Sequence, residues 1–399
     1  MAATITIDGQ TVAAWPWSPD WQQGLLERLE WLTDVLQAYR AEEQCRALRL
    51  APRQSLEFSV LVQGDERRQL EALLWSWGAK LFAVPLWFDG LQLGAALASG
   101  ATAIPLDPAG RQFAAGDLVL LVGETGRQCE LVLVESVGAD IQLASATTQD
   151  WPAGTRVFPA RVARLEGQPA LGRFTGAAST VRLVFEMDAP ATWPADAGAT
   201  TYRGRPVLEH GPNWLEEPQL ALQRKGELLD AGIGLVAFED EADMPLPTQG
   251  GRWLLVSRAE VNAWRSRLFA LRGKQGSLWV PSWTDDLSIV ADVGSSATTL
   301  DIGWIGYTDQ LLGDPNRRDI RIELHDGTVF YRRITGATVL DADTERLSID
   351  TALGVAVPKA SIALVSWLTL MRNASDSAEF AWFTGDAAET SATFRGFRA

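Results

Sequence analysis

The chain contains an internal repeat, and this feature limits its fold more than any other. Residues 84–106 align without a gap with residues 280–302, and nine of the 23 aligned positions are identical. Chance would give roughly one or two identities at ordinary composition. The aligned apolar positions also alternate in the same register, which is typical of strands. The fold must therefore be built from two copies of one unit.

The similarity continues on both sides of this segment. Further matches join 18–21 to 211–214, 124–126 to 325–327, and 174–176 to 383–385. The offset between partners grows slowly from 193 to 209 along these matches, as small loop insertions would produce. A stretch rich in Pro, Ala and Gly without periodicity separates the copies, which is typical of a linker. We expect a first repeat at 1–188, a linker at 189–198 and a second repeat at 199–399.

Each repeat shows the same order of elements. The expected elements are a strand (58–62 or 253–256), an amphipathic helix (65–77 or 258–271), the strand at the start of the aligned segment, a β-rich block, and a last strand (180–187 or 392–397). Ser257 and Glu260 form a capping box for the second helix, and Gly78 and Gly273 are the expected helix stops. Residues 25–39 fit either a helix or a strand.

The β-rich blocks consist of short alternating runs separated by turns, for example His325-Asp-Gly327. Such spacing predicts a small antiparallel β-barrel inserted into each repeat, at about 105–162 and about 301–366. The predicted fold class is mainly β (α+β): a tandem duplication of a β-sandwich-like unit with one helix, each copy carrying its inserted barrel.

Scarce residues exclude several kinds of site. Cys45 and Cys129 are far apart and lack metal-site spacing, although a single disulfide between them stays open. His210 and His325 are equally isolated, and no phosphate-binding glycine loop occurs. Any enzyme chemistry would rest on carboxylates. We predict no catalytic, cofactor-binding or metal-binding residues, no cofactor and no enzyme activity.

Two Trp–Asp pairs, Trp87 with Asp89 and Trp283 with Asp285, form the best local constellation. An aromatic ring beside a carboxylate suits a sugar-binding or glycosidase cleft. The alternative is that both Trp are core-facing strand residues beside a turn capped by Asp, and their presence in both copies favours this alternative.

The surplus of tryptophan, 17 residues against 4 Tyr, indicates large rigid contact surfaces. Trp15, Trp17 and Trp21 lie in a Pro-rich stretch and are either local core or contacts for a partner. Trp193 lies in the linker and is expected to contact the other repeat or another subunit. The acidic stretch 238–243 lacks the spacing of a calcium loop, so we expect a solvated loop.

The charge balance, 50 acidic against 35 basic residues, gives a formal charge of −15 and argues against a duplex-DNA binder. No apolar run approaches the ~18 residues that cross a bilayer, and the N-terminus lacks the pattern of a signal peptide. We expect neither membrane insertion nor sequence-specific nucleic-acid binding, and a protein that is made in the cytoplasm and stays soluble.

Several stretches resemble tail proteins of long-tailed (siphophage-like) bacteriophages, in particular distal tail proteins. These stretches are Glu30–Leu36, Glu42–Leu50 with Pro52-Arg53, Tyr202–Leu208 with Pro212–Trp214, and Arg272-Gly273 with Leu278–Trp283 and Asp286. The resemblance spans much of both repeats and brings no catalytic residues with it.

This resemblance implies a virion structural protein that forms a ring at the distal end of the tail tube. Its implied partners are copies of itself (trimer or hexamer), the tail tube protein, the baseplate hub and other tail-tip proteins, and the tape-measure protein. A ring of three chains would present six similar units. The alternatives are a glycan-binding tail-tip adhesin and a carboxylate-based cell-wall hydrolase.

Overall fold

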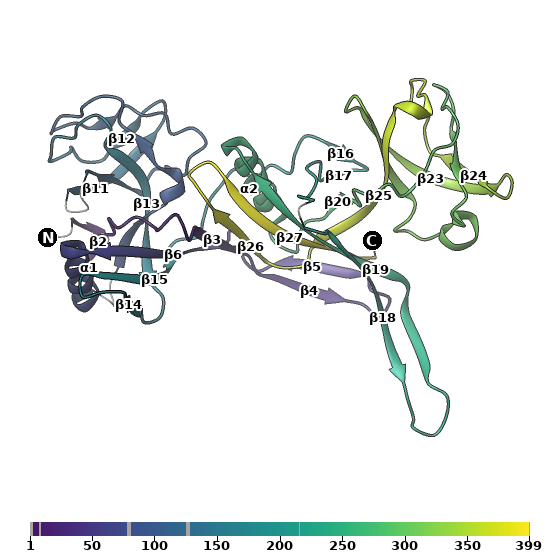
Figure 1. Ribbon diagram of the computed structural model, residues 1–399, viewed down its shortest axis with the longest axis horizontal. Coiled ribbons are helices and arrows are strands. Elements are labelled where there is room, and N and C mark those ends of the chain that lie inside the picture. Colours follow the sequence, from purple (N-terminus) through teal and green to yellow (C-terminus); the bar gives the residue numbers. More distant parts are fainter. Residues whose placement is uncertain (1–2, 8, 78–80, 125–127, 215, 399) are drawn as a thin grey trace.

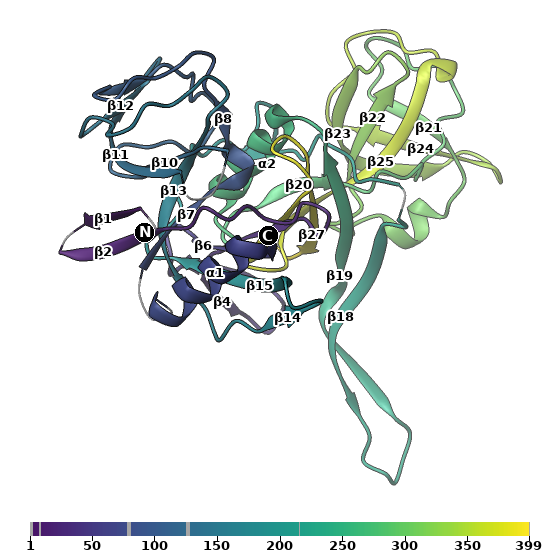
Figure 2. The same ribbon diagram turned by 60° about the vertical axis from the view of Figure 1, so that its left-hand side comes forward.

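The computed structural model describes residues 3–7, 9–77, 81–124, 128–214 and 216–398. The molecule is elongated, with one inserted lobe above each end and a long hairpin projecting below (Figures 1 and 2). Strands dominate it, so the predicted mainly β class is confirmed.

The elements of the first repeat follow in chain order. They are β1 (Thr4–Ile7), β2 (Gln10–Ala14), β3 (Leu25–Glu30), β4 (Thr33–Gln37), β5 (Glu43–Ala47), β6 (Arg53–Gln63), α1 (Gly64–Trp77), β7 (Leu81–Pro85), the 3₁₀ helix η1 (Trp87–Asp89), β8 (Leu91–Gln92), β9 (Ala103–Ile104), β10 (Leu118–Val122), β11 (Cys129–Val137), β12 (Ile141–Leu143), β13 (Arg156–Leu165), β14 (Leu171–Arg173) and β15 (Ala178–Met187).

The second repeat has a matching order. Its elements are β16 (Thr201–Tyr202), β17 (Arg205–Pro206), β18 (Gln219–Leu229), β19 (Ala237–Leu255), α2 (Arg258–Leu271), β20 (Leu278–Pro281), β21 (Thr299–Gly303), the π-helix η2 (Tyr307–Leu311), β22 (Asp319–Leu324), β23 (Val329–Val339), β24 (Thr344–Ile349), the 3₁₀ helix η3 (Lys359–Ser361), β25 (Ile362–Asn373), β26 (Ser377–Trp382) and β27 (Ala388–Gly396).

The strand pairings that build the main sheet correspond between the two repeats. In the first repeat β6 pairs with β3 and β15, and β15 pairs with β14. In the second repeat β19 pairs with β18 and β27, and β27 pairs with β26. Helices α1 and α2 follow β6 and β19, and each precedes a strand, β7 or β20, that pairs with β13 or β25. The domain boundaries inferred from the sequence stay predictions.

One antiparallel sheet of eight strands runs through both repeats. Its order is β14–β15–β6–β3–β26–β27–β19–β18, so that β3 of the first repeat joins β26 of the second. One hydrophobic core also contains buried residues from both repeats, for example Trp15, Phe185 and Trp382. Burial of that shared core stabilises the two repeats together.

Local sequence explains the helix ends. The Ser257 hydroxyl accepts a hydrogen bond from the backbone N–H of Glu260, while the Glu260 carboxylate accepts one from the N–H of Val256. Arg272 adopts the left-handed conformation and Gly273 follows with positive φ, which ends α2. Gly78 and the middle of the 124–126 turn lie outside the described residues.

The segment at 25–39 folds as strands, which settles the helix–strand ambiguity. Leu25, Glu27 and Leu29 of β3 are buried while the residues between them are half-buried. A period of two, rather than 3.6, therefore places this segment in the sheet.

The inserted lobes are open sheets, so the prediction of closed barrels is wrong. The first has the order β9–β12–β11–β10–β13–β8 and the second β21–β24–β23–β22–β25. Each lobe has its own hydrophobic core. Single bridges, Leu97 to Trp151 and Val293 to Val357, replace the ladders that closure would need.

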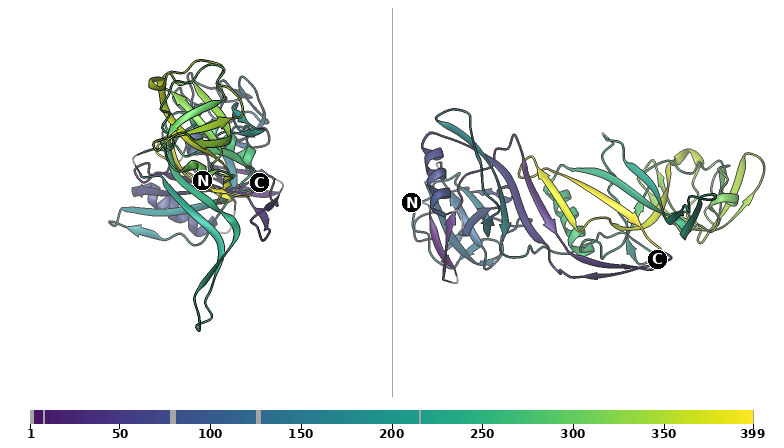
Figure 3. Two further views of the ribbon diagram at one scale, coloured as in Figure 1. Left: turned by 90° about the vertical axis from the view of Figure 1, so that its right-hand side faces the viewer. Right: turned by 90° about the horizontal axis from the view of Figure 1, so that it is seen from below.

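Two hairpin arms extend from the sheet. The first arm is β4–β5, at 33–47, and the second is the outer part of β18–β19, at 222–247. Seen end-on, the second arm reaches well beyond the rest of the molecule (Figure 3). Within the described residues, no helix has the length and apolar character needed to cross a membrane.

Candidate functional site

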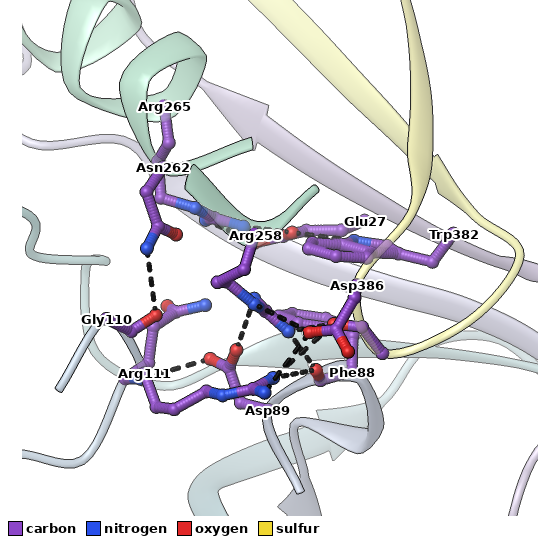
Figure 4. Close-up of polar contacts among 12 residues, drawn as sticks. Glu27, Phe88, Asp89, Gly110, Arg111, Arg258, Asn262, Arg265, Trp382 and Asp386 are labelled. Atoms are coloured by element: carbon purple, nitrogen blue, oxygen red, sulfur yellow. Dashed lines mark hydrogen bonds and ion pairs between the residues drawn. The ribbon is translucent and has the colours of Figure 1, made fainter. Parts of the chain in front are cut away.

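The two repeats meet in a densely bonded region, which we call the junction (Figure 4). Strand β3 pairs with β26 from Leu25 opposite Trp382 to Glu30 opposite Ser377. Helix α2 of the second repeat bonds to both β3 and η1 of the first. The junction therefore sets how one repeat is placed against the other.

A buried ion pair forms the centre of the junction. Arg265 on α2 donates from Nη1 to Glu27 Oε1 at 2.7 Å and from Nη2 to Glu27 Oε2 at 2.6 Å. Gln54 Nε2 and Trp382 Nε1 donate to the same carboxylate at 2.7 and 3.0 Å. Burial alone would lower the pKa of Arg265, but the charge and hydrogen bonds of Glu27 hold it above its usual value.

Asp89 of η1 supplies a second buried charge. Its carboxylate accepts hydrogen bonds from Arg258 Nη1 at 2.8 Å and from the backbone N–H of Gln112 at 3.1 Å. Burial raises the pKa of Asp89, and the nearby Arg258 opposes that rise. Burial likewise lowers the pKa of Arg258, and Asp89 opposes that fall.

Two guanidinium groups tie the loop between β26 and β27 to η1. Arg258 Nη2 donates to the carbonyl oxygens of Phe88 and Gly385. Arg111 Nη1 donates to the same two carbonyls at 3.1 and 3.4 Å, and its Nη2 pairs with Asp386 at 3.2 Å. One arginine from each repeat thus bonds to both repeats.

Aromatic contacts complete the junction. The rings of Phe88 and Trp382 stack with centroids 4.2 Å apart and planes 2° from parallel. The guanidinium of Arg258 lies 5.2 Å from the Trp382 centroid. Trp31 meets Phe269 of α2 edge to face at 5.5 Å. Such contacts contribute beyond the area they bury.

The buried charged groups of the junction pair with one another across the two repeats. In the part of the chain that the structure describes, no cluster of three or more His, Cys, Asp or Glu could hold a metal ion. The physical effect of the arrangement is to lock the two repeats into one geometry, because breaking either buried pair leaves an uncompensated charge.

The structure separates the two Trp–Asp pairs. Trp87 is buried against Phe158 and Asp89 is buried beneath Arg258, so this pair belongs to the core and the junction. Trp283 is half-buried, and Asp285 is exposed. The first pair therefore offers no accessible carboxylate to a substrate.

The other tryptophans divide between core and contacts. Trp15 and Trp17 are buried and touch each other edge to face at 5.1 Å, so local core is the correct alternative for both. Trp15 also packs on Phe185 in the core that both repeats share. Trp193 donates from Nε1 to Ser266 Oγ of α2 at 2.9 Å, a contact with the second repeat.

The remaining candidate residues carry no site. Cys45 and Cys129 are both free thiols, and His325 lies in the exposed β22–β23 turn that the sequence predicts. His210 is also exposed. The acidic stretch 238–243 is part of β19, so the expectation of a loop is wrong.

Two of the four carboxylates in that stretch pair with cations. Asp240 bonds to Arg224, and Glu241 lies 3.1 Å from Lys225. This pairing across β18 and β19 explains why an acidic segment folds as a strand.

The two arms touch each other. Ala41 at the tip of the first arm packs with Ala242, Met244 and Leu246 of the second. Lys225 Nζ donates to two backbone carbonyls of the first arm at 2.8 and 2.9 Å. The junction therefore includes the arms as well as the sheet.

The eight-strand sheet has an open face, which we define as the side turned away from the core. Its register places cross-strand ion pairs there: Arg182 with Glu57, Arg53 with Glu186, Arg28 with Glu379, and Arg252 with Glu389. Because each of these cations faces a carboxylate, these four pairs add no net charge to the open face.

A wide pocket of about 610 Å³ lies beside the junction. Trp21, Trp87 and Phe158 of the first repeat and Phe383 of the second supply its aromatic lining. Its described lining contains no carboxylate.

Comparisons with known proteins leave the family open. No protein-family model matches the chain, and a search of curated proteins finds no match.

The Glu27–Arg265 pair was not predicted from the sequence. Its partners are 238 residues apart, and neither belongs to a recognisable motif. The one available signal was indirect: in a strand, Glu27 would share one face with Leu25 and Leu29.

Proposed function

We propose that the protein is a structural component of the tail of a long-tailed bacteriophage, forming a ring at the distal end of the tube that connects it to the baseplate hub. The observation that carries the proposal is the single sheet through two equivalent repeats, held rigid by a buried junction. A wall built from repeated units needs this kind of fixed placement between neighbours. The tail-protein resemblance of both repeats supports the same role.

The open face of the sheet suits the inside of a channel that passes DNA. Phosphate affinity comes from unpaired cations, and the arginines of this face are paired with carboxylates. We expect this face to bind DNA weakly because its arginines are paired locally. The overall charge of the chain matters less, because salt screens charges beyond about 10 Å at 0.1 M ionic strength.

Gold labelling tests this role. An antibody against the second inserted lobe, which extends from the end of the molecule, is bound to intact particles and imaged by electron microscopy (Figure 1). The proposal expects label only where the tube ends and the hub begins. Label on the head or along the tube would overturn it.

A second candidate function, glycan binding at the tail tip, is favoured by the aromatic pocket beside the junction. Trp21 and Phe383 are partly exposed there and could stack on sugar rings. Binding of host polysaccharide that is lost in Trp21→Ala, with Trp304→Ala as control, would support this candidate. Equal binding by both variants would count against it. The hydrolase alternative has no carboxylate pair in this pocket to support it.

A further inference from the structure

The eight-strand sheet ends in two strands that are each paired on one side only among the described strands. These are β14 of the first repeat and β18 of the second. By the correspondence between repeats, β14 matches β26 and β18 matches β3. The two free edges are therefore the counterparts of the two edges that pair with each other inside the chain. Unpaired edges are templates for another strand.

Residues that match junction residues in the repeat alignment are exposed, because within one chain no other repeat covers them. Asp89 is buried beneath α2, whereas Asp285, its match in the repeat, is exposed. Helix α2 buries Phe269 against the first repeat, whereas α1, its counterpart, carries Trp75 with 91% of its surface exposed. An exposed aromatic of this size is typical of an interface anchor.

The arms repeat this asymmetry. The first arm packs on the second inside the chain. Beyond that contact, the outer part of the second arm exposes six apolar side chains: Leu228, Leu229, Ile233, Leu235, Val236 and Phe238. The first arm and its base expose four others: Leu32, Leu36, Leu48 and Leu50. Each arm therefore exposes apolar side chains on which the opposite arm of another copy can pack.

We infer that the chain associates head to tail with copies of itself, by pairing β18 of one copy with β14 of the next and packing its second arm on the next copy's first arm. This contact repeats the internal junction, so internal and external contacts alternate around a closed ring. The number of copies, three, rests on the proposed function, because six equivalent repeats match a sixfold tube. The ring then has a wall of 3 × 8 = 24 strands.

The repeat alignment also transfers the register. Trp21 matches Trp214, so Glu27 matches Leu220, and Phe174 matches Phe383, so Leu171 matches Phe380. Phe380 lies opposite Glu27 inside the chain. Leu171 of one copy therefore lies opposite Leu220 of its neighbour, and an apolar pair replaces the charged centre of the junction.

Disulfide cross-linking tests this register. Residues opposite each other on antiparallel strands have Cβ atoms about 4.5–5.5 Å apart, within reach of a disulfide after slight adjustment. Leu171 and Leu220 lie on the two end strands of the sheet, so a disulfide between them joins two copies. The double variant L171C/L220C, oxidised, should give covalent dimers and trimers on a non-reducing gel and nothing larger.

Control variants separate this contact from chance collisions. Each single variant alone, and L61C/L220C with Leu61 in the interior strand β6, should stay largely monomeric on that gel. Mixing the L171C and L220C chains should give dimers only. Monomers alone from L171C/L220C, or a ladder that continues past three, would overturn the inference.

A non-covalent variant tests the helix face. Trp75→Ala should weaken self-association at least about tenfold by analytical ultracentrifugation, as loss of an aromatic anchor does. Trp304→Ala removes a Trp of the second lobe that is 51% exposed and should leave association unchanged. Equal association of both variants would contradict the assignment of α1. These outcomes are independent of the gold label, so a ring of three in solution with label elsewhere on the particle would fault only the proposed function.

Discussion

Replacing Arg265 with methionine should destabilise the junction strongly. The substitution leaves Glu27 fully buried, with only the neutral donors Gln54 and Trp382. Removing one partner of a buried pair typically costs about 3–5 kcal/mol. The two short hydrogen bonds from Arg265, 2.6 and 2.7 Å, place this pair at the strong end of such contacts.

The same strands supply a matched control. Arg28 and Glu379 pair at 2.7 Å across β3 and β26, but on the open face, with side chains 40% and 46% exposed. Arg28→Met should cost less than about 1 kcal/mol, because water screens and replaces an exposed pair. Burial, rather than distance, thus decides the difference between the two arginines.

A double-mutant cycle measures the coupling. Glu27→Gln, Arg265→Met and the double variant are unfolded in urea, and hydrogen exchange of β3 and β26 locates the loss. The double variant should recover about 2–3 kcal/mol relative to the sum of the single changes, since no buried charge is then left alone. Additive effects, or a loss from Arg265→Met no larger than from Arg28→Met, would refute the reasoning.

Three further predictions concern other parts of the fold. Glu345 accepts hydrogen bonds from three backbone N–H groups, of Ile305, Tyr307 and Thr308, and although burial raises its pKa, these bonds bring it below the usual value. A carboxyl group with a lowered pKa stabilises the fold at pH values above the usual glutamate pKa of about 4.3, and this stability is lost as pH falls. Glu345→Gln should therefore lower the melting temperature at pH 7 and flatten the dependence of the melting temperature on pH. Parallel curves of melting temperature against pH would count against this. Phe88→Ala removes the ring stacked on Trp382 and should cost about 3–5 kcal/mol in urea unfolding, whereas a loss below about 1 kcal/mol would show that the stack matters little. Glu57→Gln with Glu379→Gln leaves two arginines of the open face without their carboxylates and should create salt-dependent binding to duplex DNA in a filter assay. The control, Asp341→Asn with Asp343→Asn in the second lobe, should not bind DNA. Equal binding by the two double variants would contradict the role of charge pairing.

Local patterns predicted the elements well. The helix at 258–271, its cap at Ser257 and the strands of both lobes follow from periodicity and turn chemistry, which act over a few residues. The repeat added long-range information, because each assignment in one copy supported its match in the other.

The sequence could not predict contacts that depend on which edges meet. Nothing local shows that β3 pairs with β26 or that Glu27 meets Arg265, because these contacts form only after both repeats have folded. Lobe closure was mispredicted for a similar reason: the spacing of strands is the same for an open and a closed sheet. The sequence left Trp15 and Trp17 open between core and partner contact because a Pro-rich stretch also suits a surface loop, whereas the fold buries both in the shared core.

A cryo-electron-microscopy map of isolated tail tips tests the proposed ring most directly. We expect a ring at the distal end of the tube in which three copies of this chain supply six similar units, with a continuous strand wall around the lumen. The charge-paired open face should line that lumen. A chain found outside the wall, or repeats that do not alternate around a closed ring, would contradict it.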